Sequence, residues 1–141
     1  MIIRMAEACD QAALAALFLR VRRETFHWAD VSRFHLQDWA EQSEGEQVWV
    51  AEQGERLCGL VSLWQPDWFV HHLYVSREHR GMGIGRRLLE VALDQRSAAA
   101  TLKVASHNCV ALGFYHRLGW HNSDEQGECE LTGPWVKLRL P

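Results

Sequence analysis

A glycine-rich turn between an apolar run and an amphipathic segment restricts this fold more than any other feature of the sequence. The run Leu73–Val75 is β-prone, the turn Arg80–Arg86 has glycine at positions 81, 83 and 85, and apolar residues then recur at helical spacing. Glycine removes side chains where a ligand would approach the backbone, and the first N–H groups of a helix lie free there. Arg80 and Arg86 add positive charge, and no Asp or Ser caps the helix start. The order strand, turn, helix therefore predicts a site for a pyrophosphate.

Two better-known nucleotide motifs do not fit this turn. A dinucleotide fingerprint requires a third glycine where Arg86 stands, and an acidic residue about 20 positions later, which this chain lacks. A nucleoside triphosphate loop requires Lys-Ser or Lys-Thr after the last glycine, and neither pair is present. Taken alone, the segment also remains compatible with a glycine turn that binds nothing.

Hydrophobic periodicity predicts an α+β domain covering residues 1–141, with a mixed sheet covered by helices. The first two predicted helices are capped by Asp10 and by Ser32. Gly54 marks a hairpin turn, and Gly127 is expected between the last two strands. The remaining predicted elements are strands over 48–51, 57–64, 68–75, 101–104 and 135–140, and helices over 83–95 and 108–118.

Composition narrows the classes of partner. The chain has 15 basic and 18 acidic residues, so clustered phosphate contacts to a nucleic acid are not expected. The longest apolar run, Ala12–Leu19, is too short to span a bilayer. Four widely spaced cysteines form neither a zinc motif nor a disulfide framework. We expect a cytoplasmic protein without a metal, bound neither to nucleic acid nor to membrane, as a monomer or a homodimer.

A second motif lies downstream, in Asn108–Trp120, with the sequence Asn-Cys-Val-Ala-Leu-Gly-Phe-Tyr-His-Arg-Leu-Gly-Trp. In order and spacing, this motif and the glycine turn resemble the GNAT superfamily of acetyl-CoA-dependent N-acetyltransferases. The resemblance extends over nearly the whole chain, because Ile3–Asp10 looks like the family's first strand and helix, and Val50–Gly59 looks like its hairpin. One departure is Arg77, where the family often has proline.

The resemblance implies a GNAT-type α+β fold: a mixed, mostly antiparallel sheet with splayed strands four and five, flanked by about four helices. It implies acetyl-CoA as the acyl-donor cosubstrate, whose pantetheine arm pairs with the backbone of Leu73, Tyr74 and Val75. It also implies that Asn108 hydrogen-bonds either the pantetheine or the start of its own helix. The pyrophosphate would lie on the backbone of Arg80, Gly81, Met82, Gly83, Ile84, Gly85 and Arg86.

The chemistry of amine acetylation requires an acid and a base. An alkyl ammonium has a pKa near 10, so a group or a water chain must remove its proton before it attacks the thioester. By resemblance, Tyr115 is the acid that protonates the leaving thiolate, and its alternative is a core tyrosine. Alternation along a strand favours His71 as the base, because residues 69 and 71 share one face and 70 and 72 the other. A bulge would reverse this facing and favour His72.

Two further assignments complete the predicted site. Cys109 permits a covalent route, but a lone cysteine on an apolar helix usually only packs, so direct transfer is favoured. By resemblance, Phe26, Trp28, Trp64 and His72 line the acceptor pocket, where Asp30 or Glu24 could attract an ammonium. These residues favour a small-molecule amine. A protein or peptide amine, and a CoA sensor without catalysis, remain alternatives.

Overall fold

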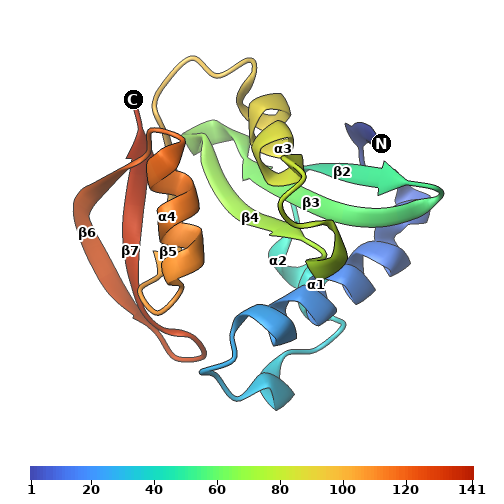
Figure 1. Cartoon of the computed structure of the whole chain (residues 1–141), viewed down its shortest axis with the longest axis horizontal. Helices are drawn as coiled ribbons and strands as arrows, with labels where there is room; N and C mark the ends of the chain where they lie inside the picture. Colours follow the sequence, from blue (N-terminus) through green and yellow to red (C-terminus); the bar gives the residue numbers. More distant parts are fainter.

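A computed structural model describes all 141 residues, and its centre is a seven-stranded sheet in the order β1-β2-β3-β4-β5-β7-β6 (Figure 1). Every neighbouring pair is antiparallel except β4 and β5, which are parallel. The predicted mixed, mostly antiparallel sheet with four helices is therefore confirmed. The strands are β1 Ile2–Met5, β2 Gln47–Gln53, β3 Arg56–Trp64, β4 Phe69–Val75, β5 Ala100–Ala105, β6 His121–Cys129 and β7 Gly133–Leu140, and the helices are α1 Gln11–Thr25, α2 Asp38–Gln42, α3 Ile84–Leu93 and α4 Cys109–Arg117.

The sheet opens between its two parallel strands, which diverge in Figure 1. Only Phe69 and Val70 of β4 pair with β5, opposite Thr101 and Leu102. Beyond Val70, the edge of β4 that faces β5 has no strand partner, while its other edge stays paired with β3 as far as Val75. The predicted splay of strands four and five is confirmed, and it leaves backbone N–H and C=O groups free to bind another chain or a ligand.

Side-chain alternation gives the sheet two apolar faces. Ala51 and Val61 join the buried cluster that includes residues of α3, whereas their neighbours Val50 and Leu60 join Phe18 of α1 in a second cluster. A period of two along each strand produces this division. Burying one such aliphatic side chain contributes about 1.5–3 kcal/mol, so both helical layers are held firmly to the sheet.

No helix is both long and apolar enough to cross a membrane.

A β-bulge interrupts this alternation in β4. Ser62 of β3 pairs with His72 and the next residue, Leu63, pairs with Val70, so His71 is an extra residue without a partner. Val70 belongs to the cluster on the α3 side, whereas the ring of His72 lies 4.7 Å from that of Phe18 on the α1 side. The prediction that residues 70 and 72 share a face is therefore wrong, because the bulge shifts the alternation by one residue.

Three smaller predictions also need correction. The side chain of Asp10 does not cap α1, because it accepts a hydrogen bond from the Glu7 N–H and pairs with Arg4 at 2.8 Å. The predicted second helix is divided, since Asp30 rather than Ser32 caps a short 3₁₀ turn at residues 31–33, and α2 begins only at Asp38.

Gly127 does not separate the last two strands but lies within β6, opposite Trp135. A Cβ atom at this position would lie 2.4 Å from the Trp135 ring. The glycine is therefore needed for packing, and the hairpin turn falls at residues 130–132.

Candidate active site

A cavity of about 80 Å³ lies where β4 and β5 diverge. Its walls come from the bulged part of β4, from β5, from the start of α4 and from the segment that follows α1. Seven of the residues predicted from the sequence meet there: Phe26, His71, His72, Leu73, Tyr74, Asn108 and Tyr115. The cavity therefore unites residues that are up to 89 positions apart in the chain, from Phe26 to Tyr115.

Tyr115 reaches the cavity from α4 and is otherwise enclosed. Its residue is 8% exposed, and its ring lies edge-on to Trp120 with the ring centres 5.8 Å apart. Burial raises the pKa of Tyr115 above its ordinary value, and the nearby Tyr74 hydroxyl adds a smaller shift in the same direction. Burial likewise raises the pKa of Tyr74 to about 12. Both phenols therefore keep their protons at neutral pH, and Tyr115 has a proton to donate.

His72 is the more buried of the two cavity histidines. Its ring packs against Phe18 and Trp39, and its Nε2 atom has no hydrogen-bond partner. Burial lowers the pKa of His72 well below its ordinary value, and the neighbouring His71 and Arg22 side chains act in the same direction. His72 is consequently a neutral imidazole at physiological pH.

His71 has a different environment, although its ring stacks on that of His72 with the centres 3.8 Å apart. Its side chain is 33% exposed, and its Nδ1 lies 2.8 Å from Oε2 of Glu46. Glu46 itself is almost enclosed, with a side chain that is 6% exposed. No pattern in the sequence selects Glu46, because it lies in a polar stretch 25 residues before His71. The pairing of Gln47 with Leu63, and of Leu63 with Val70, brings it there across two strands.

Asn108 stands at the start of α4. Its side-chain oxygen accepts a hydrogen bond from the N–H of Ala111 at 3.1 Å, which caps the helix. Of the two alternatives that the resemblance implied, the structure thus shows the contact with the helix start. The cap also fixes the first turn of the helix on which Tyr115 lies.

The glycine turn leads from β4 into α3 as predicted. Gly81 and Gly83 have φ angles of 78° and 77°, which favour glycine, and a Cβ at either position would meet no atom within 4 Å. Gly83 is the N-cap of α3, and no side chain caps the helix. Gly85 has another role, because a Cβ there would lie 3.3 Å from the Phe114 ring of α4. The open space beside the turn, where the sequence predicts an anion, is therefore at residues 81–83, and Gly85 permits helix packing.

The two arginines of the turn have neighbours within the chain. Arg86 pairs with Glu90 one helical turn later at 3.0 Å, and both side chains are largely exposed. The Nη2 of Arg80 lies 3.5 Å from the Thr25 hydroxyl, and its Nε lies 3.4 Å from the Val75 carbonyl. These contacts are exposed, so both cations can turn toward an anion at small cost.

The predicted acceptor residues do not all gather at the cavity. Phe26 lines it, and Trp28 packs edge-on to Phe26 with ring centres 5.3 Å apart. The indole N–H of Trp28 donates to the carbonyl of Thr132 at 2.8 Å, which attaches the β6–β7 turn to this side of the site. Trp64 is 40% exposed at the end of β3 and does not line the cavity. Asp30 and Glu24 do not line it either.

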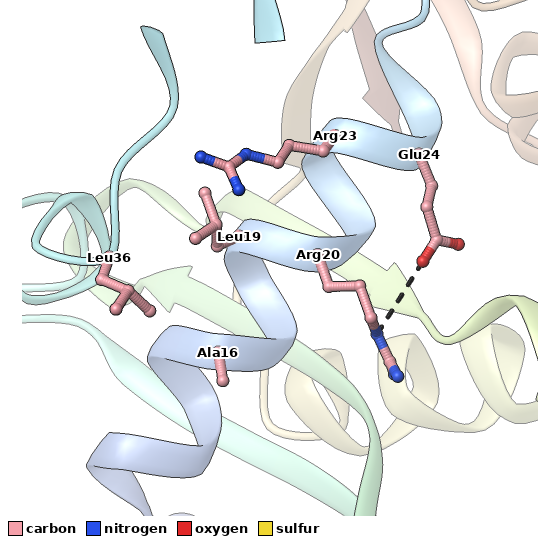
Figure 2. A pocket seen from close by; sticks show the side chains of 6 residues that line it. All are labelled: Ala16, Leu19, Arg20, Arg23, Glu24 and Leu36. Carbon is pink, nitrogen blue, oxygen red and sulfur yellow. Dashed lines mark ion pairs between the residues drawn. The ribbon is translucent and has the colours of Figure 1, made fainter. Parts of the chain in front are cut away.

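A larger hollow of about 370 Å³ lies elsewhere, along the outer side of α1. Figure 2 shows Arg20 and Glu24 joined as an ion pair on one side of the helix, with Leu19 and Arg23 directed toward Leu36. The Arg20–Glu24 distance is 3.8 Å. This hollow includes Glu24, one of the two acidic residues predicted to attract an ammonium, but none of the predicted catalytic or cofactor-binding residues, so its greater size does not make it the candidate active site.

Comparison with known proteins gives a consistent result. Residues 6–132 match the family described as "Acetyltransferase (GNAT) domain". A "Probable N-acetyltransferase" of Mycobacterium tuberculosis is 31% identical over 139 residues, covering 84% of this chain and 79% of that protein. The L-methionine sulfoximine/L-methionine sulfone acetyltransferase of Salmonella typhimurium is 28% identical, covering 98% of this chain and 91% of that protein.

Similarity extends to solved structures. The solution structure of apo-form YjaB from Escherichia coli superposes with a TM-score of 0.78 at 24% identity, covering 99% of this chain and 97% of that one. Against the human relatives that it matches, N-acetyltransferases 8 and 8B, the chain spans only about half of their length.

Proposed function

Since the chain belongs to the GNAT family of acetyl-CoA-dependent N-acetyltransferases, we propose that it moves the acetyl group of acetyl-CoA to a small-molecule amine by direct attack in a ternary complex. The observation that carries this proposal is the cavity between β4 and β5, which holds a protonated phenol and two histidines beside an unpaired strand edge. An acid, a base and a place for the thioester are thereby present within one small space.

The donor would bind along the side of β4 that β5 leaves free. The backbone of Leu73, Tyr74 and Val75 has no strand partner on that side, so the pantetheine amides can pair with it as an added strand. The pyrophosphate would then lie on the turn at residues 80–86, where the N-terminus of α3 has no side-chain cap. Asn108 supports the donor indirectly, through the helix that it caps.

The acceptor must lose a proton before it attacks. The bulge removes the alternation argument for His71, but we still assign this step to His71, because it is the more exposed of the two histidines that line the cavity. The amine nitrogen then forms a bond to the thioester carbon, while the carbonyl oxygen gains negative charge that a backbone N–H near Leu73 can stabilise. When the carbon–sulfur bond breaks, the Tyr115 hydroxyl protonates the departing thiolate. As the amide forms, its nitrogen loses a second proton, which restores the Tyr115 hydroxyl through solvent, and His71 releases the first proton to solvent, so that each acetyl transfer releases one proton.

The size and lining of the site favour a small acceptor. The cavity has a volume of about 80 Å³, and Phe26, which lines it, packs edge-on to Trp28 to form an aromatic wall. The Salmonella relative, aligned over 98% of this chain, is named for acceptors that are amino-acid analogues. An amino-acid-like primary amine is therefore the first class of acceptor to test. Trp28 would flank that acceptor from behind Phe26.

The experiment is a screen of amines with purified protein and acetyl-CoA, in which released thiol and acetylated product are measured together. The panel includes L-methionine sulfone, other amino acids, polyamines and short peptides. Turnover with a small amine is the expected result. Acetylation of peptides alone would refute the small-molecule assignment, and acetyl-CoA binding without any turnover would identify a sensor.

We also propose that residues 1–141 form one domain and that the protein is cytoplasmic. All seven strands pair into a single sheet, and all four cysteines are free. Reduced cysteines are usual in that compartment.

A further inference from the structure

The carboxylate of Glu46 has no place in the assignments above, yet it is the nearest charged group to the proposed base. Its side chain is only 6% exposed, one oxygen lies 2.8 Å from Nδ1 of His71, and the other has no hydrogen-bond partner. A carboxylate buried this far costs free energy unless it is compensated. A group kept at such a cost, and directed at a cavity histidine, calls for a functional explanation.

The hydrogen bond fixes which nitrogen of His71 holds the proton. An ionised carboxylate can only accept, so Nδ1 of His71 must be the N–H donor to Glu46. The lone pair then lies on Nε2, which is the atom available to take a proton from an amine. When Nε2 is protonated, the adjacent carboxylate stabilises the imidazolium that forms.

We propose that Glu46 is a positioning residue for acetyl transfer, which holds His71 in the Nδ1–H tautomer and stabilises its protonated form during the reaction. The inference rests on the proposed function, and it explains why His71 rather than His72 is the base. His72 has no carboxylate partner, and its Nε2 lies buried without any hydrogen bond. Two imidazole rings stacked at 3.8 Å cannot both be protonated easily, and Glu46 decides which one is.

The other groups around His71 leave Glu46 as its anionic partner. His72 faces it from β4 itself, and the Phe69 ring lies 5.9 Å away. Arg22 of α1, whose charge acts on His72, is already paired with Asp38 at 3.0 Å.

A shared metal ion is a poorer explanation of the same three residues. The donor atoms of Glu46, His71 and His72 lie within 4.8 Å of one another. However, the histidine rings are stacked with only 26° between their planes, and a nitrogen lone pair lies in the plane of its ring. The lone pairs therefore do not converge on one point, whereas the 2.8 Å contact has the length of a hydrogen bond.

The test compares Glu46→Gln and Glu46→Asp with Glu44→Gln, which makes the same change at an exposed glutamate two residues away. Glu46→Gln should lower kcat by about ten to a thousandfold at neutral pH, with acetyl-CoA affinity and melting temperature near those of the wild type. The acidic limb of its kcat/KM profile should move to lower pH, because the imidazolium has lost its carboxylate. Glu46→Asp should restore part of the rate, and Glu44→Gln should match the wild type.

Two further measurements make the inference independent of which acceptor is found. In a His71→Ala background, Glu46→Gln should cause no additional loss of rate, because a positioning residue acts through the group it positions. Long-range proton–nitrogen NMR correlations of the imidazole rings should show His71 as the Nδ1–H tautomer in the wild type. An Nε2–H tautomer, an additive loss in the double variant, or equal rates for Glu46→Gln and Glu44→Gln would each overturn the proposal. Absence of turnover with every amine, despite the Nδ1–H tautomer, would instead refute the proposed function.

Discussion

Replacing Gly83 with aspartate tests the pyrophosphate site most directly, with Gly83→Asn as its uncharged partner. Both side chains enter open space, since a Cβ at residue 83 would meet no atom within 4 Å. Both also face the same φ of 77°, which Asn and Asp tolerate better than other residues. We therefore expect both variants to fold, with similar losses of stability of about 1 kcal/mol.

The difference between the two variants lies in their affinity for acetyl-CoA. Two like charges about 5 Å apart repel by about 0.8 kcal/mol at the dielectric constant of water and by about 3.3 kcal/mol at an effective value of 20. For each phosphate charge, Gly83→Asp should thus bind about 4 to about 250 times more weakly than Gly83→Asn. Calorimetry at low salt and at about 0.5 M salt measures this ratio, which should shrink as salt screens the repulsion. Equal affinities in two folded variants would refute the location of the anion site.

Three other predictions follow from the geometry. Tyr115→Phe should lower kcat by about ten to a thousandfold and leave acetyl-CoA affinity unchanged in calorimetry, because only the proton donor is removed; full activity at every pH would contradict the assigned role. His71→Ala should lose rate most at neutral pH and recover as rising pH deprotonates the amine unaided, whereas His72→Ala should lower the melting temperature by leaving a hole beside Phe18. The hydrogen bonds from Arg4 and, to a smaller extent, from the Glu7 N–H hold the pKa of Asp10 at about 2, below the ordinary value of 3.8. The stability that Asp10 provides is therefore present above about pH 4 and is lost as pH falls toward 2, so Asp10→Asn should cost about 1–2 kcal/mol in urea unfolding at pH 7 and much less at pH 2.

The sequence was sufficient for those features that depend on local order along the chain. A glycine turn followed by a helical pattern predicted the uncapped start of α3, because positive φ angles at Gly81 and Gly83 require glycine. Periodicity predicted a helix over 108–118 that carries Tyr115, and α4 is that helix, whereas its cap by Asn108 was one of two alternatives that only the resemblance implied. The splay of strands four and five came only from resemblance, because no pattern within one strand reports where a neighbouring strand leaves it.

The features that were missed depend on register between distant strands. Glu46 reaches His71 because two pairings, between β2 and β3 and between β3 and β4, place their ends side by side. No spacing in the sequence encodes that proximity. Gly127 is predicted from the sequence to lie between the last two strands, whereas the Trp135 ring opposite it explains the glycine. In each case the deciding contact is made across the sheet rather than along the chain.

The bulge at His71 links the two halves of the proposed chemistry. The pairing of β4 with β5 ends at Val70, and the extra residue is the next one along the strand. A bulge bends its strand and increases the local twist, so it turns β4 away from β5 at the point where the cavity begins. The same extra residue places the His71 ring on the side of His72, where it meets Glu46. One inserted residue thus accounts both for the opening that would admit the thioester and for the orientation of the base, and a strand with regular alternation at this point would have neither.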